Sequence, residues 1–148
     1  MITDEKRLEE LEDIIDELTE RSESEAIIVE GSRDVKAMRA LGIVGIIRPV
    51  NIGTSIINFC EVLSTEHDRF IIMTDWDRKG GQLAQLLRRG FVTVDTKYDD
   101  ILRKKIAHLT KKDVKDVEGL PAYIQRLRES VERKSPKSHR KHHRFQKD

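Results

Sequence analysis

Four short apolar runs, each followed by a turn and then by helical periodicity, dominate the middle of this sequence. They are Ala26–Val29, Ile43–Ile47, Phe70–Met73 and Phe91–Val94. Apolar runs of this length, bounded by turn residues, predict buried strands. Because helices of about ten residues separate the runs, the strands should lie parallel and be joined by right-handed crossovers. The sequence therefore predicts an α/β, Rossmann-like fold, in which helices flank a sheet of about four parallel strands.

Helical patterns precede and follow this core. Residues 3–22 have apolar side chains at spacings of three and four, with carboxylates on the opposite face, which predicts an amphipathic helix packed on the domain. Thr3 is its expected N-cap. Between the strands we expect helices over residues 33–41, 56–63 and 80–89, and after them helices over 98–109 and 121–132. The predicted organisation is an N-terminal helix (1–23), a domain (24–132) and a basic, disordered tail (133–148).

Composition narrows the classes of protein. The chain has 148 residues and a formal net charge of +1, but acidic residues crowd its first 25 positions while none occurs between Lys134 and Lys147. This asymmetry indicates a polyanionic partner for the basic end, and an inert solubilising tail or a histidine metal tract are the alternatives. Cys60 is the single cysteine and is expected to be a core thiol, so a cysteine-based zinc cluster is excluded. No apolar run approaches a membrane span, and we expect a cytoplasmic protein.

The third apolar run ends at two aspartates, Asp75 and Asp77, and a glycine pair follows. Side chains alternate along extended backbone, so these two carboxylates should project to the same side at the carboxyl end of the strand. In open α/β sheets, ligands bind at that end. Two converging carboxylates repel each other unless a cation or a proton lies between them. The pattern predicts a divalent metal site, with Mg²⁺ the expected ion and Mn²⁺ an alternative.

Glu30 is the second acidic feature, because it directly follows the first predicted strand. If that strand lies beside the third, Glu30 meets Asp75 and Asp77 and can share their metal. Its other interpretation is a charge at a helix N-terminus. Asp34 is either a carboxylate that accepts from backbone donors in the first helical turn or a member of the acidic cluster, and the structural role is favoured.

Basic and small residues border the same predicted edge. Arg33, Arg78 and Lys79 are expected to hold phosphates, and the alternative is solvent-exposed surface charge, which is what most such residues are. Gly80 permits close approach of a phosphate to the helix N-terminus. Trp76 lies between the two aspartates, where it either stacks on a base or packs as a hydrophobic lid.

These residues resemble the Toprim domain, which topoisomerases, bacterial-type primases, recombination proteins and small rRNA-maturing nucleases share. The resemblance rests on Val29-Glu30-Gly31-Ser-Arg-Asp34 and, some 40 residues later, on Thr74-Asp75-Trp-Asp77-Arg-Lys-Gly80. It implies that Glu30 is a general acid/base or metal-linked carboxylate and that Asp75 and Asp77 hold Mg²⁺. The chain most resembles compact, stand-alone members, since it offers neither a separate DNA-gripping domain for a topoisomerase tyrosine nor the cysteines of a primase zinc module.

The leading functional hypothesis is a Mg²⁺-dependent nuclease that acts on structured RNA or DNA. Its catalytic residues would be Glu30, Asp75 and Asp77. The alternative is a non-catalytic, metal-dependent nucleic-acid-binding module of a larger complex, and either role is compatible with a protein partner or a homodimer. A doubly wound receiver domain ranks last, because its acidic pair would follow the first strand instead of a later one.

Overall fold

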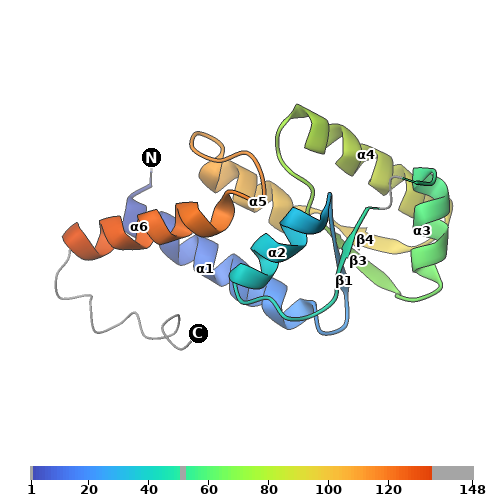
Figure 1. Cartoon of the computed structure of the whole chain (residues 1–148), viewed down its shortest axis with the longest axis horizontal. Coiled ribbons are helices and arrows are strands. Elements are labelled where there is room, and N and C mark those ends of the chain that lie inside the picture. Colours follow the sequence, from blue (N-terminus) through green and yellow to red (C-terminus); the bar gives the residue numbers. More distant parts are fainter. Residues whose placement is uncertain (1, 51–52, 135–148) are drawn as a thin grey trace.

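The computed structural model describes residues 2–50 and 53–134. In this part of the chain, four strands form one parallel sheet and six helices surround it (Figure 1). The strands are β1 (Ala26–Val29), β2 (Ile47–Pro49), β3 (Arg69–Ile72) and β4 (Lys97–Asp99). The helices are α1 (Asp4–Arg21), α2 (Ser32–Ala40), α3 (Ile56–Ser64), α4 (Arg78–Thr93), α5 (Ile101–Thr110) and α6 (Leu120–Lys134). The predicted α/β class is confirmed.

The sheet order is β2-β1-β3-β4, and every neighbouring pair is parallel. From β1 the chain first moves outward to β2, and it later returns to the other side of β1 to form β3 and then β4. The direction of winding therefore reverses between β1 and β3. In doubly wound sheets, a ligand crevice opens at the carboxyl ends of the strands at such a switch point.

Two apolar layers cover the two faces of the sheet. Alternate residues of β1 and β3 face opposite sides, so Ile27 and Ile71 lie in one cluster while Ile28 and Ile72 lie in the other. The first cluster contains apolar residues of α1, α2, α5 and α6, and the second contains those of α3 and α4. Figure 1 shows these helices as two layers with the sheet between them.

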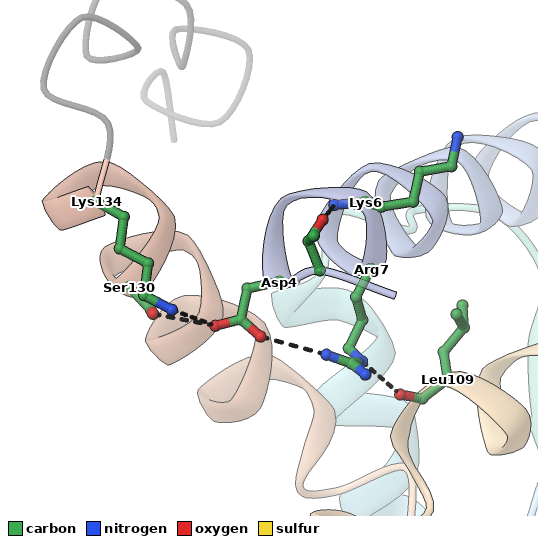
Figure 2. Close-up of polar contacts among 7 residues, drawn as sticks. Asp4, Lys6, Arg7, Leu109, Ser130 and Lys134 are labelled. Atoms are coloured by element: carbon green, nitrogen blue, oxygen red, sulfur yellow. Dashed lines mark hydrogen bonds and ion pairs between the residues drawn. The ribbon is translucent and has the colours of Figure 1, made fainter. Parts of the chain in front are cut away.

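Polar contacts tie the start of α1 to the two C-terminal helices (Figure 2). Arg7 donates from Nε to the carbonyl of Leu109 at 3.0 Å and pairs with Asp4 at 3.3 Å. The second carboxylate oxygen of Asp4 accepts from Ser130 and from Lys134 of α6, at 3.3 and 3.2 Å. Thr3 caps α1 as predicted, since its hydroxyl accepts from the backbone N–H of Lys6.

Two strands lie further along the chain than the sequence predicted. The second strand is Ile47–Pro49 rather than Ile43–Ile47. It is an edge strand, so Pro49, which was predicted to end it, can be tolerated there without its N–H. Residues 43–45 precede the ladder, and Arg39 Nη1 donates to the carbonyls of Ile43 and Gly45. The carbonyl of Ile46 already accepts from the backbone N–H of Ile27 in β1.

The fourth strand is Lys97–Asp99 rather than Phe91–Val94, because α4 does not stop at Gly90. Phe91 lies on the same helical face as Ala84 and Leu87, and all three are fully buried. A Cβ at Gly90 would lie 2.6 Å from the sulfur of Cys60, so this glycine lets α3 and α4 approach closely. Cys60 itself is a buried core thiol, as predicted. The following helix begins at Ile101, three residues later than predicted.

None of the helices in residues 2–50 and 53–134 is both long enough and apolar enough to cross a bilayer. The basic tail predicted for residues 133–148 begins within α6, and residues 135–148 lie outside the described part of the chain.

Candidate metal centre

Glu30, Asp75 and Asp77 come together at the switch point between β1 and β3. Glu30 directly follows β1, whereas the two aspartates lie in the segment that joins β3 to α4. Each residue offers a carboxylate oxygen, and these oxygens lie within 4.8 Å of one another. The sequence predicted this proximity from the positions of the residues at strand ends, and the pairing of β1 with β3 brings it about.

The two aspartates are positioned by individual hydrogen bonds instead of by strand alternation. Strand β3 ends at Ile72, one residue earlier than predicted, so Asp75 and Asp77 lie beyond the ladder. Asp77 is the N-cap of α4, and its Oδ1 accepts from the backbone N–H of Gly80 at 2.7 Å. Oδ1 of Asp75 accepts from the backbone N–H of Val117 at 2.9 Å.

Glu30 is half-buried and bonded to the same segment. Its Oε2 accepts from the backbone N–H of Asp75 at 3.0 Å. Burial raises the pKa of Glu30, and the charges of Asp77 and Asp34 raise it further, while the bond from Asp75 and the charge of Lys79 oppose the shift. Glu30 is thus more than a charge near the N-terminus of α2, because it contacts the aspartate-bearing segment directly.

Asp75 is a half-buried carboxylate whose pKa is strongly raised. Burial raises the pKa of Asp75 to about 7, and the charges of Glu30, Asp34 and Asp77 add to this shift. The hydrogen bond from Val117 opposes the shift and is outweighed. A carboxylate that resists ionisation beside two others gains from a cation, which neutralises their mutual repulsion.

Gly80 is required by the packing of the site. A Cβ at this position would lie 2.0 Å from the carbonyl oxygen of Asp75. The hydroxyl of Thr74, which is fully buried, donates to the Gly80 carbonyl at 2.8 Å. The absent side chain therefore lets the first turn of α4 pack directly against the backbone of Asp75. This packing accounts for the glycine, whereas its predicted role in phosphate binding stays a prediction.

Residues 111–119, which join α5 to α6, cover one side of the acidic cluster. Trp76 binds this loop twice, from its backbone N–H to the Lys115 carbonyl at 2.9 Å and from indole Nε1 to the Val114 carbonyl at 2.8 Å. Trp76 is half-buried and packs against the core cluster that contains Val114 and Val117. The structure thus shows the packing role for Trp76 of the two that the sequence left open.

Asp34 has the structural role that the sequence favoured. Its Oδ2 accepts from the backbone N–H of Gly31 at 3.0 Å, at the start of α2. Burial raises its pKa, as do the charges of Glu118 and Asp116 in the covering loop. The loop therefore adds two carboxylates to the neighbourhood of the site, although sequence reasoning did not select either of them.

The predicted phosphate-binding cations are exposed. Arg33 lies in the first turn of α2, and Arg78 and Lys79 open α4. In residues 2–50 and 53–134, no ion pair uses any of these three side chains. Exposed Lys115 of the covering loop is a further cation on this side, because its backbone bonds to Trp76.

Arg103 contacts the site, and sequence reasoning missed it. This α5 residue donates from Nε to the carbonyl of Thr74 and from Nη2 to the carbonyl of Asp75. It occupies one of several basic positions on a helix rich in lysine, so no local pattern distinguishes it. The N–H of Val117 is equally invisible to sequence reasoning, because every residue except proline carries one.

The donor set of the cluster fits a hard divalent cation. All three groups are carboxylates, the oxygen ligands that Mg²⁺ and Mn²⁺ prefer. One oxygen of each is bonded to a backbone N–H, at Asp75, Val117 and Gly80 respectively. Each carboxylate therefore has a second oxygen for a metal ion, and the surrounding bonds hold the three groups in place before any ion arrives.

Comparison with known proteins agrees with this arrangement. The family model of the Toprim domain matches residues 25–109, which include β1 to β4, all but the last residue of α5, and all three carboxylates. A UPF0292 protein of Methanosarcina acetivorans is 41% identical over 126 residues, covering 83% of this chain and 85% of the relative. One from Thermococcus onnurineus is 40% identical over 116 residues, covering 78% of this chain and 81% of the relative. The name UPF0292 states no activity.

A solved structure of a protein from Aquifex aeolicus has the same fold. It superimposes with a TM-score of 0.63 and 23% sequence identity, and the match covers 74% of this chain and 97% of that protein. At this identity, the likeness supports the fold alone.

Proposed function

This chain belongs to the Toprim domain family and to the UPF0292 proteins within it, and from that premise we propose that it is a Mg²⁺-dependent nuclease. The family supports a metal-dependent role related to nucleic acids, and the finer activity is our proposal. The substrate class is a structured RNA or DNA, and the reaction is cleavage of a phosphodiester bond. A cytoplasmic location belongs to the same proposal.

One observation carries the proposal. Three carboxylates from two adjacent strand ends place oxygens within 4.8 Å of one another, although carboxylates this close repel each other and two of them, Glu30 and Asp75, are half-buried. Hydrogen bonds from backbone N–H groups hold the three carboxylates together despite this repulsion. Such an arrangement favours a bound divalent cation, and a phosphate is the substrate group that this cation would then face.

Each residue has a proposed role. Asp75 and Asp77 would hold Mg²⁺, which stabilises negative charge on a scissile phosphate when bound. Glu30 would take up or deliver a proton, which its raised pKa favours, or help to bind a second ion. Mn²⁺ suits the same oxygen ligands and is expected to substitute.

The exposed cations would bind the backbone of the nucleic acid. Arg33, Arg78 and Lys79 lie on the two helices that start at the acidic cluster, and Lys115 lies on the covering loop. Contacts to phosphates carry no sequence information directly and weaken as salt rises. We therefore expect affinity for nucleic acid to fall with ionic strength and to depend little on base sequence.

The test is cleavage of end-labelled structured RNA and DNA in the presence of Mg²⁺ or Mn²⁺. The variants Asp75→Asn, Asp77→Asn and Glu30→Gln should each lose cleavage. Asp68→Asn is the matched control, because Asp68 is an exposed aspartate that precedes β3 at the opposite end of the sheet. Retention of full cleavage by all three site variants would show that this cluster is not the active site.

A non-catalytic, metal-dependent binding module is the second candidate. It is favoured by the bond that already engages Oε2 of Glu30, which limits the freedom of the proposed proton carrier. In this case the same assay would show Mg²⁺-dependent binding of nucleic acid, lost in the site variants, without cleavage by the wild type. A protein partner or a second copy of the chain would then supply the catalytic groups.

A further inference from the structure

Arg103 is a buried arginine that holds the backbone of the acidic site from within the protein. It lies in the first turn of α5 and is only 8% exposed. Its Nε donates to the Thr74 carbonyl at 2.9 Å, and its Nη2 donates to the Asp75 carbonyl at 2.8 Å. One planar guanidinium therefore bonds two consecutive carbonyls of the segment that carries the predicted metal ligands.

The geometry of these bonds is specific to arginine. The guanidinium presents its N–H groups in a rigid fork, whereas a lysine ammonium is a compact charge on a flexible stem. In residues 2–50 and 53–134, Arg103 makes no ion pair, and the nearby Asp100 pairs instead with Arg88 and Lys104. The N–H groups of Arg103 thus donate to backbone carbonyls, while its positive charge interacts with the carboxylates of Glu30 and Asp75.

Two other contacts hold the same residue, one at its carbonyl and one at its carboxylate. The backbone of Gly80 packs against the Asp75 carbonyl, and the carboxylate of Asp75 accepts from Val117. Asp75 is therefore held at its main chain by Arg103 and α4, and at its side chain by the covering loop. If the 74–75 backbone turned, the carboxylate of Asp75 would move away from Glu30 and Asp77.

We propose that Arg103 is a positioning residue of the metal centre, which fixes the 74–75 backbone so that the Asp75 carboxylate faces Glu30 and Asp77. This inference rests on the proposed function only in that the three carboxylates bind a divalent cation. Arg103 acts through hydrogen-bond geometry, so its positive charge alone does not suffice. Residues that orient metal ligands in this way typically change metal affinity by about 10- to 100-fold when they are replaced.

The experiment is a titration of the full chain with MgCl₂, read by the fluorescence of Trp76, the single tryptophan, which lies between the two aspartates. Arg103→Lys keeps the charge and Arg103→Gln removes it, and both should weaken Mg²⁺ binding at least about tenfold. Thermal unfolding without metal is measured in parallel, so that affinities are compared only among folded variants.

Arg21 provides the matched control. It is a partly buried arginine at the end of α1, where it pairs with Glu17 of the same helix, with Glu25 before β1 and with Asp99 of β4. Arg21→Lys and Arg21→Gln should lower the melting temperature and leave the Mg²⁺ affinity unchanged. Wild-type affinity in both Arg103 variants, or in Arg103→Lys alone, would overturn the positioning role. If the wild type itself binds no Mg²⁺, the proposed function fails and the inference fails with it.

A second measurement uses only the wild-type protein, so it does not depend on whether the Arg103 variants fold. In ¹⁵N-labelled wild-type protein, the Nε–H resonance of Arg103 should shift when MgCl₂ is added, because the carbonyl of Thr74 that it bonds lies next to Asp75. The Nε–H of Arg21 bonds Glu25, which precedes β1 whereas Glu30 follows it, and this resonance should not shift. An unchanged Arg103 signal in a protein that binds Mg²⁺ would contradict the inference.

Discussion

The backbone N–H of Val117 donates a 2.9 Å hydrogen bond to Oδ1 of Asp75, across 42 residues of sequence. This bond links the loop between α5 and α6 to a carboxylate at the carboxyl edge of the sheet. Together with the two bonds from Trp76 to the same loop, it makes the C-terminal part of the chain a wall of the candidate metal centre. The site is therefore built from both halves of the chain.

Mg²⁺ affinity should depend on pH through Asp75. The pKa of Asp75 is raised from 3.8 to about 7, and Mg²⁺ binds the ionised carboxylate. Below pH 7 the metal must displace a proton, so the apparent affinity should rise about tenfold per pH unit up to pH 7 and then level off. Titrations followed by Trp76 fluorescence at several pH values test this. Equal affinity at pH 5 and pH 8 would contradict it.

The free energy of unfolding of the metal-free protein should also depend on pH through Asp75. Unlike the Mg²⁺ affinity, it should fall as the pH rises. Because the folded-state pKa of Asp75 lies above the value of 3.8 for an unperturbed carboxyl, the folded state binds this proton more tightly. The resulting stabilisation is fully present below pH 3.8 and is lost as the pH rises through about 7. Asp75→Asn has no such proton, so at pH 8 without metal it should be more stable than the wild type, by roughly 1–3 kcal/mol.

Urea unfolding of the two proteins at pH 5 and pH 8 provides the measurement. The advantage of Asp75→Asn should be smaller at pH 5, where the wild type retains its proton. Saturating Mg²⁺ should stabilise the wild type and leave the variant unchanged, since a ligand stabilises only the state that binds it. A variant that is less stable than the wild type at pH 8 would show that repulsion within the cluster is minor.

Replacing Gly80 and replacing Gly81, the third and fourth residues of α4, with alanine should have different effects on stability and on Mg²⁺ binding. At Gly80 the new Cβ would lie 2.0 Å from the Asp75 carbonyl, so Gly80→Ala should displace this segment, cost about 1–3 kcal/mol of unfolding free energy and weaken Mg²⁺ binding. At Gly81 a Cβ would meet only Arg103 Nη2, at an ordinary contact distance of 3.8 Å. Gly81→Ala should therefore stabilise the protein by about 0.5–1 kcal/mol and keep the site intact.

Thermal unfolding and MgCl₂ titration of both alanine variants separate these outcomes, and Gly81→Ala is the control for helix propensity. Similar effects of the two substitutions on Mg²⁺ affinity would argue against close packing at Gly80 as a requirement of the site.

Substitutions of Asp77 should separate its two roles, which are capping α4 and binding the metal. Its Oδ1 caps α4 by accepting from Gly80, and its carboxylate belongs to the acidic cluster. Asparagine is also a good N-cap, so Asp77→Asn should lose Mg²⁺ binding without losing stability. Asp77→Ala should lose both, with a cost of about 0.5–2 kcal/mol. Metal affinity and urea unfolding of the two variants make the comparison, and equal stabilities would mean that the cap contributes little.

Sequence reasoning located the acidic cluster because the signals for it are local. Glu30 and Asp75 each follow an apolar run, and parallel strands bring their carboxyl ends to one edge of a sheet. The fold class followed from the same alternation of runs and helical periods. The predicted positions of β2 and β4 were wrong because Pro49 was interpreted as the end of a strand and Gly90 as the end of a helix. In the folded protein, α3 packs against Gly90, and Pro49 lies in an edge strand.

The amino-acid sequence by itself determined the α/β class, the carboxyl edge of the sheet as the site and the three carboxylates that gather there, since periodicity and strand ends are properties of neighbouring residues. Only the tertiary structure decided how those carboxylates are held. Arg103 bonds Asp75 across 28 residues and Val117 bonds it across 42, and neither bond has a local signature. Such contacts arise when the packing of α5 and the following loop against the sheet brings a donor beside a buried acceptor that would otherwise have no partner.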